Sequence, residues 1–144
     1  MASQIPGAAV RLTPRAVTTS GIRVPLTFAL GTSAAVIRAV PLLLIDLETE
    51  EGVTGRTYLF CYTASGARAV ADHIREAVDL ISGVPTTPLD LAKFLQRRFA
   101  LLGVTGTVRM ALWDAIARSF GQPLWSCWAL LRGHCRPMTA GASG

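Results

Sequence analysis

The stretch VPLLLIDLETEEGVTGRTYLFCYT (40–63) decides the fold. It holds two runs rich in β-branched, aliphatic and aromatic residues, joined by a short acidic turn that ends in glycine. This pattern predicts an antiparallel β-hairpin. Because alternate residues of a strand share a face, we expect Tyr58, Phe60 and Tyr62 on one side of the second strand and the residues between them on the other.

The residues before the hairpin are less regular. Segment 9–19 leans towards a strand but is interrupted by Pro14. Segment 21–32 contains Pro25 and Gly31, which together predict more loop than strand.

The second half changes to helical periodicity. We expect Thr63 to cap a helix that reaches about residue 82, and Thr87 to cap a second one. The second helix is expected to stop before residue 103 and to turn four side chains inward, which are Leu91, Phe94, Leu95 and Phe99. The stretch TVRMALWDAIARSFGQPLW (107–125) predicts a third helix, and a short fourth is expected over 123–133. Strands followed by helices predict an α+β domain with helices on one face of a small antiparallel sheet.

Composition narrows the class of protein. Of 144 residues, 51% are apolar and only 16% charged, so we expect part of the surface to be made for a partner. The longest clean apolar run, VPLLLI, is too short to cross a membrane, and the N-terminus lacks the pattern of a secretory signal. Three cysteines without a CxxC pair favour a reducing, cytoplasmic location over a disulfide framework.

Charge and spacing argue against two further classes. The net charge is +5, but the arginines are scattered, which favours a solvated surface over a nucleic-acid site. Cys127, His134 and Cys135 match no zinc spacing, so ordinary packing is the better interpretation there.

Four segments together resemble the N-terminal capping domain of the mandelate racemase and muconate lactonizing enzyme family, within the enolase superfamily. They are VPLTFALGT (24–32), the hairpin 40–63, LGVTGTVRMA (102–111) and LWDAIARSFGQPL (112–124). The resemblance implies an α+β fold with a three-stranded antiparallel sheet followed by a helical bundle. By this resemblance, residues 1–8 are a disordered tail, 9–135 the capping domain, and 136–144 the start of a barrel domain or a disordered tail.

The resemblance also implies a function. In such an enzyme a (β/α)-barrel holds Mg²⁺ on three carboxylates, and a base removes the proton α to a substrate carboxylate, giving a racemase or an acid dehydratase. The cap lines the substrate pocket. By position, the pocket wall would comprise Leu30, Ala34, Ile37, Phe60 and Tyr62. The plainer alternative is that Leu30, Ile37 and Phe60 belong to the core of the cap.

The catalytic parts are not expected in this chain. The family's base belongs to a Lys-x-Lys motif on a barrel strand, whereas the one lysine here, Lys93, lies in a predicted helix. The nine acids form no set on successive strands, and those of the hairpin turn, Glu50 and Glu51, are expected to be solvated. We therefore expect no catalytic residue, no metal and no cofactor here, Mg²⁺ belonging to the full-length parent, and no activity for the chain alone.

The third predicted helix departs from the family. In the family, about two more helical turns separate the residue that matches Arg109 from the Trp-Asp pair, which here is Trp113-Asp114. We therefore expect the helix to be roughly 10 Å shorter. Its apolar residues are expected to stay on one face, because a loss of two turns hardly changes the helical phase.

Three roles remain open. The chain is a substrate-selecting cap whose partner is the parent enzyme's barrel, a docking module for a separate barrel-containing subunit, or a non-catalytic remnant. A carboxylate substrate is expected only with the barrel present, and neither nucleic acid nor a membrane is an expected partner. An aromatic or apolar 2-hydroxy acid is the favoured substrate of the parent.

Overall fold

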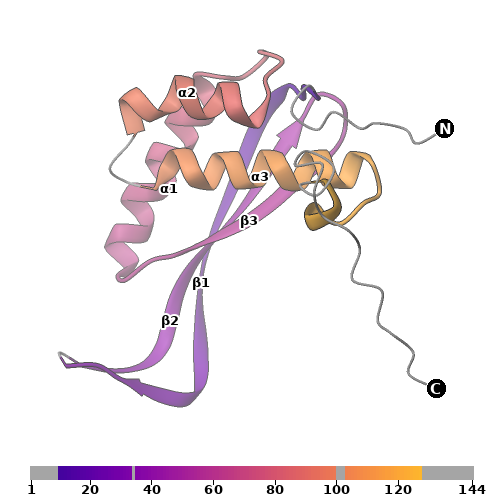
Figure 1. Ribbon diagram of the computed structural model, residues 1–144. Helices are drawn as coiled ribbons and strands as arrows, with labels where there is room; N and C mark the ends of the chain where they lie inside the picture. The colour runs from indigo at the N-terminus through magenta and orange to yellow at the C-terminus, as the bar shows by residue number, and fades with distance from the viewer. Residues whose placement is uncertain (1–9, 34, 100–102, 128–144) are drawn as a thin grey trace, which may run out of the picture.

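A long antiparallel sheet with helices on one face forms the body of the molecule (Figure 1). The computed structural model describes residues 10–33, 35–99 and 103–127. The elements are β1 (Pro14–Gly31), β2 (Val36–Thr49), β3 (Thr54–Phe60), α1 (Ala64–Asp79), α2 (Pro88–Phe99) and α3 (Val104–Ser119). The strand order is β1-β2-β3, with both pairs antiparallel. The predicted α+β class, with three strands followed by helices, is confirmed, and no barrel is present among the described residues.

The β2–β3 hairpin follows the predicted pattern. Its turn is closed by Thr49, whose hydroxyl donates to the Val53 carbonyl at 2.8 Å, and by Gly52, whose φ of +79° suits glycine. The two strands pair from Glu48 opposite Thr54 to Leu42 opposite Phe60. Alternate β2 residues point under the helices and are buried, namely Leu43, Ile45 and Leu47. This row forms the sheet side of the core.

The prediction that 21–32 is more loop than strand was wrong. β1 runs through this segment as one strand and pairs with β2 up to Pro25 and again at Leu30 and Gly31. Pro25 is tolerated because β1 is an edge strand, and the register shifts between Pro25 and Leu30. The sequence showed the strand breakers but not the long partner strand that overrides them.

The first two helices begin as predicted. The Thr63 hydroxyl accepts from the Gly66 amide at 3.0 Å, and the Thr87 hydroxyl accepts from the Asp90 amide at 3.1 Å. α1 ends at Asp79, about one turn earlier than expected. Phe94 was predicted to point inward, but it is 60% exposed, so the inward stripe of α2 is narrower than the sequence suggested.

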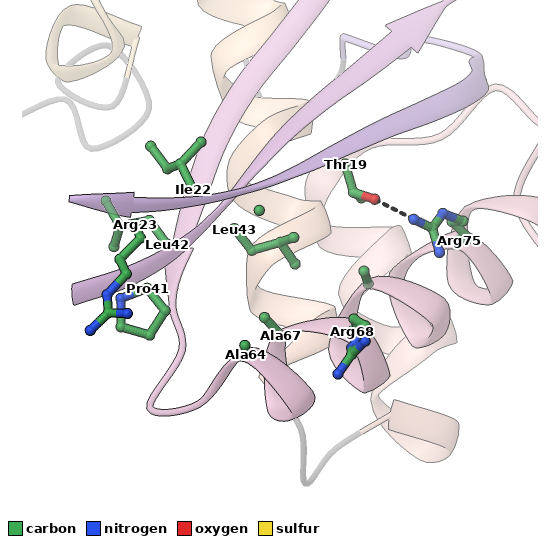
Figure 2. Close-up of a pocket in the computed structure, with 12 residues that line it drawn as sticks. Thr19, Ile22, Arg23, Pro41, Leu42, Leu43, Ala64, Ala67, Arg68 and Arg75 are labelled. Atoms are coloured by element: carbon green, nitrogen blue, oxygen red, sulfur yellow. Dashed lines mark hydrogen bonds between the residues drawn. The ribbon is translucent and has the colours of Figure 1, made fainter. Parts of the chain in front are cut away.

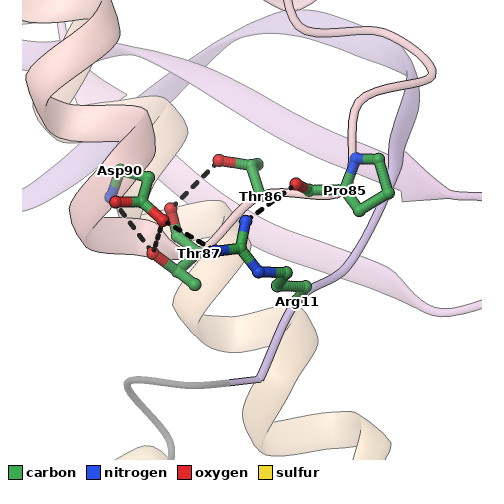
Figure 3. A network of polar contacts seen from close by, with 5 residues as sticks. All are labelled: Arg11, Pro85, Thr86, Thr87 and Asp90. Atoms are coloured by element: carbon green, nitrogen blue, oxygen red, sulfur yellow. Dashed lines mark hydrogen bonds and ion pairs between the residues drawn. The ribbon is translucent and has the colours of Figure 1, made fainter.

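A polar network joins the start of α2 to the segment before β1 (Figure 3). Arg11 donates to the Pro85 carbonyl at 3.3 Å and pairs with Asp90 at 3.5 Å. Leu12 and Thr86 form an isolated antiparallel bridge beside it. These contacts close the end of the molecule opposite the β1–β2 hairpin tip.

α3 lies closely against β3. It starts at Val104, three residues before the predicted stretch, after Gly103, whose φ is +67°. Gly55 of β3 faces α3 so tightly that a Cβ there would overlap the Ala111 carbonyl oxygen and lie 2.8 Å from the Ala115 Cβ. Asp114 ties the two elements by accepting from the Arg56 amide at 2.7 Å. No helix among the described residues is long and apolar enough to cross a membrane.

Candidate functional site

The ends of β1 and β2 form a two-stranded arm that leaves the body of the molecule. β3 ends at Phe60, which pairs with Leu42, so β2 has only β1 as a neighbour over residues 36–40. We call residues 24–40 the arm. Figure 1 shows it extending away from the helices and bending near its tip. A short turn closes the tip, where the Thr32 hydroxyl donates to the Ala35 carbonyl at 2.8 Å and accepts from the Ala35 amide at 3.0 Å.

The arm exposes large apolar side chains. Phe28 is 85%, Val36 61% and Leu30 54% exposed. Leu30 pairs with Ile37 across the strands, and Ile37 is half-buried. No described residue of the arm is buried. The alternative in which Leu30 belongs to the core of the cap is therefore wrong. Ala34 lies outside the described residues.

Phe60 and Tyr62 form a second apolar cluster where β3 runs into α1. Their rings meet edge to face with centroids 4.9 Å apart. Tyr62 is 86% exposed and Phe60 39%, so this pair also stands apart from the core. Phe60 therefore contacts the ring of Tyr62 directly. Tyr58, two residues earlier, is exposed on the same face, as the alternation of β3 predicted.

The predicted wall residues thus occupy two places at one end of the molecule. Ile37 precedes Leu42, the residue paired with Phe60, by five positions, which is roughly 16 Å of extended strand. The fold brings Leu30 to Ile37 and Phe60 to Tyr62, while the two pairs remain separate. Phe28 and Val36 were not singled out from the sequence. Two large apolar residues near a hairpin tip could have indicated an exposed apolar surface, but the tip can be located only once β1 is recognised as a strand.

The described residues do not fit a Mg²⁺ site. They contain no group of three or more His, Cys, Asp or Glu side chains placed to hold a metal ion. Many carboxylates already have partners: Asp46 pairs with Arg56, Glu48 with Arg15 and Asp90 with Arg11. Lys93 lies on the exposed side of α2.

The two described cysteines and Glu51 take part in the packing and hydrogen bonding of the fold. Burial raises the pKa of the Cys61 thiol, and it raises the pKa of Cys127, so both remain protonated and unreactive. Glu51 lies on the exposed hairpin turn, as expected, and both of its carboxylate oxygens accept from the Thr13 amide at 3.0 Å. Partial burial works to raise the pKa of Glu51, but the hydrogen bonds from Thr13 and Thr49 outweigh it, so the pKa is lowered.

A family model described as "Mandelate racemase / muconate lactonizing enzyme, N-terminal domain" matches residues 12–128. This chain belongs to that family. The family expected from the sequence is therefore confirmed, and the arm, the hairpin and the helices described above make up its N-terminal domain.

Solved structures of the mandelate racemase / muconate lactonizing enzyme type agree with this assignment. An enolase from the alphaproteobacterium bal199 with bound magnesium is 31% identical, with a TM-score of 0.73, over 81% of this chain and 34% of its own length. An enolase from Bradyrhizobium, in complex with magnesium and mandelic acid, is 30% identical with a TM-score of 0.73, over 84% of this chain and 36% of its own. An L-talarate dehydratase from a Polaromonas species, complexed with Mg and L-glucarate, shares the fold at 23% identity and a TM-score of 0.63, over 87% of this chain and 36% of its own. The chain spans about a third of the length of these relatives.

Proposed function

We propose that this chain is the substrate-selecting cap of a Mg²⁺-assisted enzyme that removes the proton α to a carboxylate, as a racemase or an acid dehydratase does. The observation that carries the proposal is the exposure of Phe28, Leu30 and Tyr62 at the end of the molecule that carries the arm. Large apolar side chains gathered at one end are typical of a surface that a partner covers. A relative with 30% identity is described with magnesium and mandelic acid, which supports an aromatic 2-hydroxy acid as the ligand.

The remaining two thirds of the relatives' length supply what this part lacks. A (β/α)-barrel there would hold the metal and the base, and the arm together with Tyr62 would close the pocket over the substrate. An apolar wall recognises the substrate side chain and excludes water, which strengthens the charged interactions beneath it. This chain selects and shields, while the proton transfer takes place on the barrel.

A chimera tests the proposal. Residues 12–128 replace the matching N-terminal domain of the Bradyrhizobium relative, and mandelate binding is measured by calorimetry with Mg²⁺ and with EDTA. We expect mandelate to bind only with Mg²⁺. We also expect its α-proton to exchange for deuterium, which NMR detects. The relative's barrel expressed without any cap is the control and should bind more weakly. A chimera that circular dichroism shows to be folded, but that binds no better than the capless barrel, would contradict the proposal.

The docking-module alternative uses the same surface and differs only in covalent connection. Mixing the separate 144-residue chain with the capless barrel distinguishes the two. Restoration of mandelate binding on mixing would favour a cap that works as a separate subunit. Restoration in the chimera alone would favour a cap that works as part of one chain.

A further inference from the structure

A groove lies at the base of the arm, between the sheet and the first turns of α1. Its volume is about 470 Å³. Figure 2 shows Ala64 and Ala67 of α1 on one side of it, with Leu43 and Pro41 of β2 opposite. Because alanines line the helix side, the groove remains open beside the apolar floor.

Three arginines line this groove, and two of them have no acidic partner. Arg75 is held by Asp72 and by the Thr19 hydroxyl, to which it donates at 2.6 Å. Arg23 of β1 and Arg68 of α1 make no ion pair or side-chain hydrogen bond with any described residue. Six arginines of the described chain, Arg75 among them, pair with carboxylates, whereas Arg38, Arg97 and Arg109 are without an ion pair like Arg23 and Arg68.

The two segments that build this end of the molecule contain no acid, and Asp72, which directly follows them, is paired with Arg75. Residues 17–45 and 57–71 build the arm, the end of β3 and the start of α1, and they include Arg23, Arg38 and Arg68 but no Asp or Glu. All nine acids of the chain lie outside these two segments. These two segments therefore carry a net charge of +3 out of the +5 of the whole chain, on the end that also exposes Phe28, Leu30 and Tyr62.

We propose that the groove between β1, β2 and α1 is a docking site for a carboxylate-bearing loop of the barrel, with the loop's apolar residues on Pro41 and Leu43 and its carboxylates on Arg23 and Arg68. Charge complementarity identifies the occupant: a positive end without acids is attracted to a negative surface and repelled by a positive one. An arginine guanidinium pairs with a carboxylate through two parallel hydrogen bonds, which also fixes the orientation of the loop. The inference rests on the proposed function, because it names how the cap is held against its barrel.

The charge contacts stabilise docking only where they are shielded from water. Arg23 and Arg68 are exposed in the chain alone, where a surface ion pair contributes little. Covering the groove with the barrel would remove water from both sides of each pair and strengthen it. The pairing therefore adds to the apolar contact of the arm and gives the docked state one defined orientation.

Charge reversal in the chimera tests this site. We compare the double variant Arg23→Glu/Arg68→Glu with the matched double variant Arg97→Glu/Arg109→Glu. Arg97 and Arg109 are also exposed and without an ion-pair partner among the described residues, and they lie on α2 and α3, outside the groove. Both variants change the net charge equally. Each thermal midpoint is measured in the chimera and in the isolated chain, so that effects on the cap itself are subtracted.

The groove variant is expected to lower the midpoint of the chimera by at least ~3 °C at low salt beyond its effect on the isolated chain. The difference should shrink towards 1 M salt, since salt screens the lost attraction. The control variant should show no such excess. Equal midpoints for the two double variants in the chimera would overturn the inference, whether or not the chimera binds mandelate.

Photo-crosslinking provides a second measurement. Benzoylphenylalanine placed at Ala64, in the groove, should crosslink to a barrel peptide that contains Asp or Glu, whereas the same residue at Leu89 on α2 should not. A crosslink from position 64 to an acid-free peptide would contradict the proposed occupant.

Stabilisation of the isolated chain by acetate or phosphate, combined with no midpoint difference in the chimera, would identify a small-anion site instead. Failure of mandelate binding with a clear midpoint difference would contradict the proposed function and not the docking site.

Discussion

The absence of a Cβ at Gly55 allows α3 to approach the sheet closely. Gly55 is the one position on β3 where the helix backbone lies against the strand without room for a Cβ. The strand needs no unusual conformation there, because Gly55 is absent from the positive-φ residues of the described chain. The glycine is therefore required by the packing distance and not by the backbone angle.

Replacing Gly55 tests that requirement. Gly55→Ala should destabilise the chain by about 3 kcal/mol, because the Ala111 carbonyl belongs to a helix that cannot move without disturbing the core. Gly21→Ala is the control: nothing lies within 4 Å of its new Cβ, so stability should stay level or rise by about 0.5 kcal/mol. Urea unfolding followed by circular dichroism measures both. Equal stability of the two variants would mean that α3 can shift freely on β3.

Glu51 should make part of the stability depend on pH. Its folded-state pKa is lowered, so its contribution is present above the ordinary value near 4.5 and is lost as the pH falls through the lower folded value. Glu51→Gln should therefore reduce the free energy of unfolding at pH 7, and the gap to the unaltered chain should close in more acidic solution. Glu50→Gln serves as the control, since no described hydrogen bond involves the Glu50 carboxylate. A gap that stays constant from pH 7 to pH 3 would contradict a role for ionised Glu51.

At the scale of elements, sequence predicted best those features whose causes are close in the chain. The hairpin, the Thr63 and Thr87 caps and the outward row of aromatics on β3 each follow from residues a few positions apart. β1 was mispredicted because Pro25 and Gly31 break local strand patterns, while the pairing that overrides them comes from β2. Phe94 was mispredicted because apolar spacing alone cannot tell how wide a face α2 buries.

The tie between α3 and β3 is the element-scale contact most open to test. Asp114 accepts from the Arg56 amide at 2.7 Å and from the Arg118 side chain at 2.6 Å. Asp114→Ala removes both bonds and should lower the free energy of unfolding by about 1–3 kcal/mol. Asp79→Ala is the matched control, because Asp79 is exposed at the end of α1, where an acid opposes the helix dipole, and its loss should be neutral or slightly stabilising. Chemical denaturation measures the stability of both variants. Equal denaturation midpoints would show that the hydrogen bonds of Asp114 do not stabilise the fold.

On the scale of the whole molecule, the chain divides into a part that holds the buried core and an arm that holds none of it. The buried residues lie between the helices and the part of the sheet that the helices cover, whereas the arm has none among its described residues. The wall residues are predicted through resemblance to a family. Their separation into two clusters, and the groove beside them, depend on where β3 stops relative to β1 and β2, which no local pattern encodes.

This division gives a prediction with opposite outcomes at the two ends. Phe28→Ser and Leu30→Ser should leave the stability of the isolated chain within about 0.5 kcal/mol, since both side chains are largely exposed. Leu43→Ala, at 3% exposure, should cost about 2–5 kcal/mol. In the chimera the first two should weaken mandelate binding about tenfold. Thermal unfolding measures the stability of the isolated chain, and calorimetry measures mandelate binding in the chimera. A large loss of stability from either arm variant would show that the arm side chains are packed in the core.

The bare two-stranded arm also has a consequence for evolution. Because its side chains are not buried in the fold, selection for stability does not restrict which residues occupy them. Mutations at the tip can therefore accumulate while the protein goes on folding. Under the proposed function, a lineage built on this domain would change its substrate by drift at a few positions between residues 24 and 40, with the helices and the sheet beneath them left unchanged.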